Sequence, residues 1–240
     1  FPIQNLMIAF GSGTAVGVNA LLSKSLGEKN FKRANQAANN GIFLFFLTFI
    51  AFSVYGLLGS RAFFRTQTDI GEIVDYGTDY LFVCTTFSFA LFGQIIFERL
   101  LQSTGKTFYA MITQATGAIV NIILDPIMIF GLLGIPAMGV KGAAIATVIG
   151  QICGMLLAIW FNLRKNHEIR ISFRGFRPDL EIIKKIYAVG IPSVLMISIG
   201  SIMNYFLNRI LLSFTETASA VFGVYFRLQS FVFMPVFGLN

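Results

Sequence analysis

Long stretches without a charged residue alternate with short polar segments along this chain. Each of the first six stretches is close to the roughly 20 apolar residues that an α-helix needs to cross a bilayer. The last stretch is also apolar but is interrupted by Arg227. The stretches are 1–23, 41–60, 80–97, 107–124, 142–163, 186–208 and 217–240. The pattern predicts an all-α, polytopic membrane protein whose seven spans form a helical bundle.

Composition and charge distribution agree with this prediction. Hydrophobic residues make up 55% of the chain and charged residues 12%, and the mean hydropathy is +0.74, whereas about a quarter of a soluble domain is charged. Thirteen Lys and Arg residues fall on one side of the predicted topology and three on the other, which makes the first side cytoplasmic. We expect a multi-pass protein of the cell membrane in contact with lipids. Its net charge of +7 is interpreted as a sorting signal, and we expect no nucleic-acid partner.

The longest polar connection divides the chain into an N-terminal lobe over 1–161, a cytoplasmic linker over 162–185 and the start of a C-terminal lobe over 186–240. Within the linker, apolar residues follow helical spacing, which predicts an amphipathic helix on the cytoplasmic surface. These residues are Leu180, Ile182, Ile183 and Ile186. The outer connection over 61–79 has similar spacing and predicts a short interfacial helix.

Small residues recur at a spacing of four within two of the predicted spans. Gly13 and Gly17 lie in the first span, and Gly150 and Gly154 lie in the fifth. Such pairs allow helix backbones to approach closely in a membrane. Close helix packing is therefore expected at both positions.

One face of the predicted helix over 107–131 is polar. Gln114, Gly117, Asn121 and Asp125 follow i, i+3, i+7, i+11 spacing and share this face. An ionisable residue at such a depth is a candidate functional residue by default. The face is therefore expected to point away from lipid.

Asn121 and Asp125 lie one helical turn apart, so both side chains can reach one small ion or one proton. Pro126 is expected to bend the helix and to leave the carbonyl of Ile122 free. The next span offers the hydroxyl of Thr147. These oxygens suit a proton or a hard cation such as Na⁺, with no other metal and no cofactor expected. The alternative is structural: Asp125 caps a helix that restarts at Pro126, and Asn121 bonds a neighbouring helix.

Further polar residues within the spans predict the lining of a substrate cavity. Interhelical hydrogen bonds explain them equally well from sequence. The residues are Gln4, Asn5, Gln94 and Gln114.

Enzymatic chemistry finds little support in the sequence. The single histidine, His167, lies in the basic linker without a second imidazole nearby, and Cys84 and Cys153 both fall within spans. The segment 103–107 ends like a phosphate-binding loop, but Leu100 replaces the glycine that this motif requires. We therefore expect the protein not to be an enzyme.

Several motifs resemble the multidrug and toxic compound extrusion (MATE) transporters. The motifs are the segments 98–107, 121–126 and 138–147, together with the segment 2–29. The resemblance implies that the chain corresponds to the second through eighth helices of a two-lobed, twelve-helix protein. The chain is accordingly expected to be part of a longer protein, monomeric in its complete form, and not to function alone.

The resemblance also implies an activity and a site. Family members are antiporters that export organic cations and other amphipathic compounds in exchange for Na⁺ or H⁺. Asn121, Asp125 and Thr147 match three residues of the family's cation or proton site, whose fourth residue is an acid on the first helix. Two alternatives remain open at this stage: a flippase for lipid-linked precursors of the same superfamily, and an intramembrane enzyme.

Overall fold

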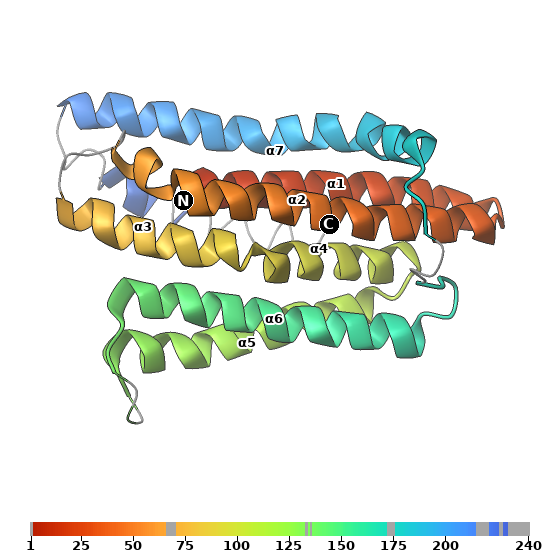
Figure 1. Ribbon diagram of the computed structural model, residues 1–240, viewed down its shortest axis with the longest axis horizontal. Coiled ribbons are helices and arrows are strands. Elements are labelled where there is room, and N and C mark those ends of the chain that lie inside the picture. Colours follow the sequence, from red (N-terminus) through yellow and green to blue (C-terminus); the bar gives the residue numbers. More distant parts are fainter. Residues whose placement is uncertain are drawn as a thin grey trace.

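The computed structural model describes residues 2–65, 71–132, 134, 136–171, 176–214, 221–225 and 228–229. Long helices make up most of these residues and run side by side (Figure 1). They are α1 (Pro2–Gly27), α2 (Phe31–Arg65), α3 (Gly71–Thr86), α4 (Ser88–Ser103), α5 (Thr107–Phe130), α6 (Gly139–Lys165) and α7 (Leu180–Phe214).

The helices confirm the predicted membrane bundle. Among the described residues, α1, α2, α5, α6 and α7 are each long and apolar enough to cross a membrane. The helices α3 and α4 are only 16 residues long each, but together they form one possible span with a bend of 45° near Phe87. These six units contain the first six predicted spans. Most of the seventh, 217–240, lies outside the described residues.

Large apolar side chains cover much of the surface of the bundle. Leu58 is 80% exposed and Met196 is 79% exposed, and isoleucines such as Ile122 lie exposed along α5. Extensive apolar surface is unusual on a soluble monomer, but it suits contact with lipid chains. The surface therefore agrees with the hydropathy pattern.

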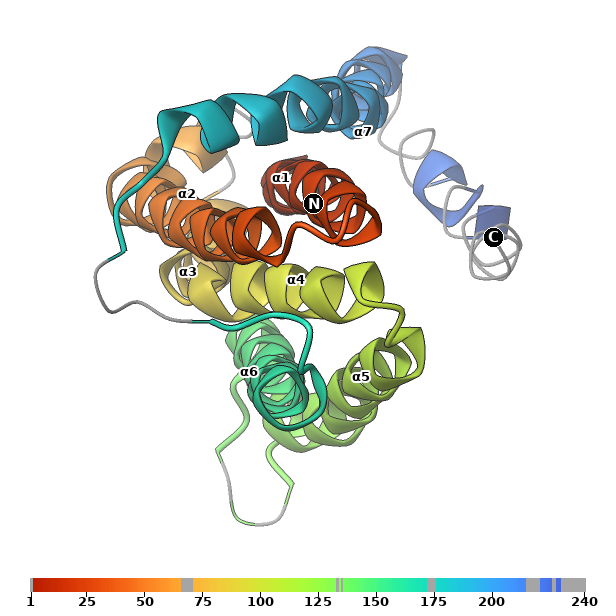
Figure 2. The same ribbon diagram turned by 90° about the vertical axis from the view of Figure 1, so that its right-hand side faces the viewer.

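The helices form layers when the bundle is viewed from its end. Figure 2 shows α7 lying across α1 and α2, the bent pair of α3 and α4 beneath them, and α5 and α6 on the far side. The core is centred on α1, α2, α4 and α7. Met7, Leu22, Ile42, Leu100 and Ile186 are among its fully buried side chains.

The glycine pairs permit close contacts, as their spacing predicts. A Cβ atom at Gly17 would lie 2.1 Å from the carbonyl oxygen of Ile186 on α7, and one at Gly13 would lie 2.9 Å from the backbone nitrogen of Val194. A Cβ atom at Gly150 would lie 2.7 Å from the carbonyl oxygen of Gly117. The backbones of α1 and α7, and those of α5 and α6, are therefore nearly in contact.

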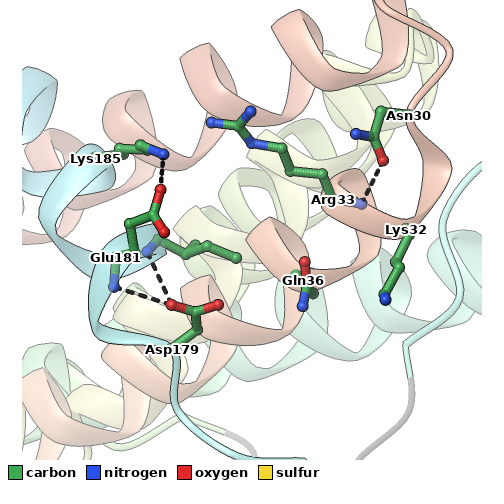
Figure 3. A pocket seen from close by; sticks show the side chains of 8 residues that line it. Asn30, Lys32, Arg33, Gln36, Asp179, Glu181 and Lys185 are labelled. Atoms are coloured by element: carbon green, nitrogen blue, oxygen red, sulfur yellow. Dashed lines mark hydrogen bonds and ion pairs between the residues drawn. The ribbon is translucent and has the colours of Figure 1, made fainter.

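Two asparagines of α2 accept hydrogen bonds from the backbone of the linker. The backbone nitrogen of Arg170 donates a hydrogen bond to Oδ1 of Asn35 (2.8 Å), and that of Asp179 donates to Oδ1 of Asn40 (3.0 Å). Oδ1 of Asp179 in turn accepts a hydrogen bond from the backbone nitrogen of Glu181 (2.9 Å), which caps the start of α7. A surface pocket of about 300 Å³ lies between this cap and the start of α2 (Figure 3).

The amphipathic pattern over 180–186 belongs to the first turns of α7, a helix of 35 residues. Ile182 is 5% exposed and Ile186 is fully buried, so the apolar stripe packs against protein. The pattern predicted a separate amphipathic helix on the cytoplasmic surface, because periodicity shows that a stripe is buried without showing what buries it. The segment predicted as an interfacial helix, 61–79, is likewise divided between the end of α2 and the start of α3.

Candidate cation-coupling site

Asn121, Asp125 and Thr147 lie together between α5 and α6. Nδ2 of Asn121 donates hydrogen bonds to Oδ1 of Asp125 (3.2 Å) and to Oγ1 of Thr147 (3.4 Å). The hydroxyl of Thr147 donates to the carbonyl oxygen of Ala143 (2.9 Å), so it is free to accept from Asn121. All three site side chains are half-buried. The cluster joins residues 26 positions apart in the sequence.

Close packing of α5 against α6 positions this cluster. Gly117 and Gly150 face one another, and a Cβ atom at Gly150 would also lie 3.2 Å from Cβ of Asn121. The absence of a side chain at Gly150 therefore lets Asn121 approach α6. The same contact brings Thr147, about one turn before Gly150, within reach of the Asn121 amide.

We expect Gly150→Ala to damage this arrangement. The added methyl group would meet the backbone of α5, so the two helices must separate, at a cost of about 2 kcal/mol. Thermal unfolding of the full-length protein should show the loss. Gly200→Ala is the control, because a Cβ atom at Gly200 meets no atom of the described residues within 4 Å. Equal stability of the two variants would contradict the proposed role of the glycine contact.

The structure does not place a helix start at Pro126. Helix α5 is continuous from Thr107 to Phe130 with Pro126 inside it, so Asp125 does not cap a restarted helix. The proline ring still removes one backbone hydrogen-bond donor from the helix. The other structural alternative, a bond from Asn121 to a neighbouring helix, coexists with the cluster, since Asn121 contacts Thr147 on α6.

Tyr80 of α3 contacts α1 near the cluster, and no sequence pattern indicated this contact. Its hydroxyl donates to Oε1 of Gln4 (3.5 Å), and Asp125 is among the charged groups close enough to influence it. Gln4 thus lies near the predicted coupling residues, whereas its neighbour Asn5 is exposed. Tyr80 lies on α3, at the first position of the predicted span 80–97.

Gln94 and Gln114, which the sequence predicts to line a substrate cavity, both donate hydrogen bonds to one buried carboxylate. Nε2 of Gln94 donates to Oε1 of Glu98 (2.9 Å), and Nε2 of Gln114 donates to Oε2 (2.9 Å). The hydroxyl of Thr113 lies 2.9 Å from Oε1. Glu98 is only 5% exposed. Sequence reasoning placed this acid in a polar connection and did not select it.

The site and the fold agree with a family of membrane transporters. The model of the MatE family matches residues 1–127, which is more than half of the chain. The chain belongs to this family, and it is part of a multi-pass membrane protein. Members of the family are transporters and not enzymes, so the alternative of an intramembrane enzyme is set aside.

Curated relatives align along the whole chain. It is similar to the multidrug export protein MepA of Staphylococcus haemolyticus, with 29% identity over 243 residues that cover 100% of this chain and 52% of the relative. It is also similar to the probable multidrug resistance protein YoeA of Bacillus subtilis, with 25% identity and the same coverage. The chain therefore spans about half the length of the curated relatives it matches.

Solved structures resemble the bundle closely. A multidrug resistance MATE family transporter of the MOP superfamily in an inward-facing conformation matches with a TM-score of 0.89 and 28% identity, over 99% of this chain and 54% of its own. A MOP superfamily transporter from Pyrococcus furiosus matches with the same TM-score and identity, over 52% of its own chain. The described helices thus follow an established transporter fold.

Proposed function

We propose that this chain serves in a cation-coupled antiporter that exports organic cations and other amphipathic drugs across the membrane. Family membership supports a role in transport, and the relatives named as multidrug exporters support drugs as the substrate class. The observation that carries the coupling is the Asn121, Asp125 and Thr147 cluster between α5 and α6.

The cluster is chemically suited to bind one cation reversibly. A carboxylate within a membrane bundle is costly to ionise unless a proton or cation compensates it. If Asp125 takes up a proton, the Asn121 amide can turn to accept it as a hydrogen bond. If the ion is Na⁺, the same rotation directs Oδ1 of Asn121 toward the ion. Together with oxygens of Asp125 and Thr147, this gives the all-oxygen ligand set that hard cations prefer.

Coupling then follows because ion binding and drug binding favour different conformations of one transporter. Export of an organic cation is driven when ion binding at Asp125 favours one conformation of the two lobes and ion release favours the other. Gln4 and Asn5, on α1, are proposed to line the substrate cavity near this site. Gln94 and Gln114 are proposed to line this cavity only with those side-chain atoms that do not bond to Glu98.

Transport by the reconstituted full-length protein tests this function. Vesicles containing the protein and ethidium are exposed to an imposed gradient of Na⁺ or of H⁺. At least one gradient should drive ethidium against its own concentration gradient, and collapsing that gradient should stop transport. If neither gradient moves ethidium or any other organic cation of a varied panel, the proposed function is wrong.

A further inference from the structure

A second carboxylate lies outside the cluster at Asp125, and no part of the proposed coupling uses it. Glu98 is on α4, five residues before the cytoplasmic end of that helix at Ser103. Its partners Thr113 and Gln114 lie on α5, roughly 11 Å along the helix axis from Asn121. The two acids therefore occupy different depths of the bundle.

The surroundings of Glu98 are those of a group that is neither exposed nor paired with a cation. Among the described residues, no Lys or Arg forms an ion pair with it. Arg99 acts on it electrostatically, but the guanidinium donates to Oε1 of Gln102 (2.8 Å). An ionised carboxylate buried without a cation carries a desolvation penalty of several kcal/mol. Three neutral donors offset part of that penalty.

The helices around α4 carry other titratable side chains. On α5 these are Tyr109, which packs on Phe161 of α6, and Asp125 in the coupling cluster. On α6 the nearest by sequence position is Cys153, next to Gly154. On α1 the group is Lys24, which pairs with Glu28 (3.9 Å). The described titratable residues of α2 and α3 include Arg33 near the start of α2 and Cys84 near the end of α3.

The hydroxyl of Thr113 has two neighbours but only one hydrogen. Its Oγ1 lies 2.7 Å from the carbonyl oxygen of Ala110 and 2.9 Å from Oε1 of Glu98. When Glu98 is ionised, Thr113 donates to the carboxylate. When Glu98 carries a proton on Oε1, Glu98 donates to Thr113, and Thr113 turns to donate to Ala110. Both glutamines continue to donate to Glu98 in either state.

We infer that Glu98 is a second, reversible proton-binding site of the transporter, distinct from the cluster around Asp125. The step is the uptake of one proton from water by Oε1 of Glu98, accompanied by rotation of the Thr113 hydroxyl toward Ala110. Only this hydroxyl must move, because the remaining hydrogen bonds are complete with and without the proton. Gln114 is exposed and donates to Oε2, so it marks the side from which the proton arrives.

The packing around Gln94 supports a specific binding site at Glu98. A Cβ atom at Gly154 of α6 would lie 2.8 Å from Nε2 of Gln94, so this glycine leaves space for the amide that donates to Glu98. Three helices thus contribute: α4 supplies Glu98 and Gln94, α5 supplies Thr113 and Gln114, and α6 supplies the space. A carboxylate needed only to join α4 to α5 would remain in one protonation state throughout.

Infrared difference spectroscopy of the full-length protein in lipid nanodiscs distinguishes these roles. Between about pH 5 and about pH 9, the wild type should gain and lose the carbonyl band of a protonated carboxyl group. Glu98→Gln should remove the component of that band that belongs to Glu98, whereas Asp125→Asn should leave this component in place. Band changes that are identical in the wild type and Glu98→Gln would overturn the inference, whatever the outcome for Asp125 or for transport.

Thr113→Val provides a second test that keeps the carboxyl group, should Glu98→Gln fail to fold. Valine has nearly the shape of threonine but cannot accept a hydrogen bond, so the carbonyl band of protonated Glu98 should shift in frequency. Thr116→Val is the matched control, because the hydroxyl of Thr116 donates to the carbonyl oxygen of Ile112 (2.8 Å). An unshifted band in Thr113→Val, or an equal shift in both variants, would overturn the inference.

Discussion

Asp125→Asn in the full-length protein is expected to reduce gradient-driven export to the level of vesicles without protein. The asparagine preserves the size of the side chain and can still bond to Asn121, but it can neither take up a proton nor supply a negative charge to a cation. Export of ethidium under an imposed Na⁺ or H⁺ gradient measures the effect. Size-exclusion chromatography should show the variant folded and monodisperse.

The control for this variant is Asp75→Asn. Asp75 lies near the start of α3, with its side chain 74% exposed and 3.8 Å from Arg61. An exposed ion pair of this kind contributes little to stability, so export should be unchanged. Export by Asp125→Asn that matches the export by Asp75→Asn would remove the coupling role from Asp125.

Gly17→Ala is expected to destabilise the full-length protein by about 3 kcal/mol. The new Cβ atom would lie 2.1 Å from the carbonyl oxygen of Ile186, and backbone on both sides prevents an easy adjustment. Helices α1 and α7 must therefore separate where the linker enters the second lobe. Thermal unfolding in detergent and the yield of folded protein both report the loss.

Gly27→Ala, in the same helix, controls for the change in helix propensity. Within the part of the chain that the structure describes, a Cβ atom at Gly27 meets nothing within 4 Å, and alanine favours helix over glycine by up to about 1 kcal/mol. We expect Gly27→Ala to be as stable as the wild type or slightly more stable. Equal stability of the two glycine variants would show that the contact between α1 and α7 is less tight than described.

Hydropathy predicted the bundle well because each span must satisfy its own backbone in lipid, which makes the signal local. The spacing of Asn121 and Asp125 likewise predicted a shared face, since four residues make about one turn. Thr147 joined them as a hydroxyl on the next predicted span, and the family resemblance then matched it to the same site. The close contact of Gly117 with Gly150 explains why that resemblance corresponds to a real proximity.

The missed features depend on tertiary contacts. The third predicted span stops at residue 97, just before Glu98, because a charged residue normally marks a polar connection. The structure buries it, since Thr113 and Gln114 reach back from α5, 15 and 16 residues later. The only local signal was Gln94, one turn before Glu98. Tyr80 was missed for a similar reason, as its partner Gln4 lies 76 residues away.

The central claim is that an ion binds at Asp125 and that its binding is the coupling step. Charge displacement in full-length protein adsorbed on a solid-supported membrane, without any drug, measures ion binding most directly. A jump in Na⁺ or H⁺ concentration should give a transient current in the wild type and in Asp75→Asn, and a strongly reduced current in Asp125→Asn. A current in Asp125→Asn as large as that of the wild type for the ion that drives export would contradict the claim.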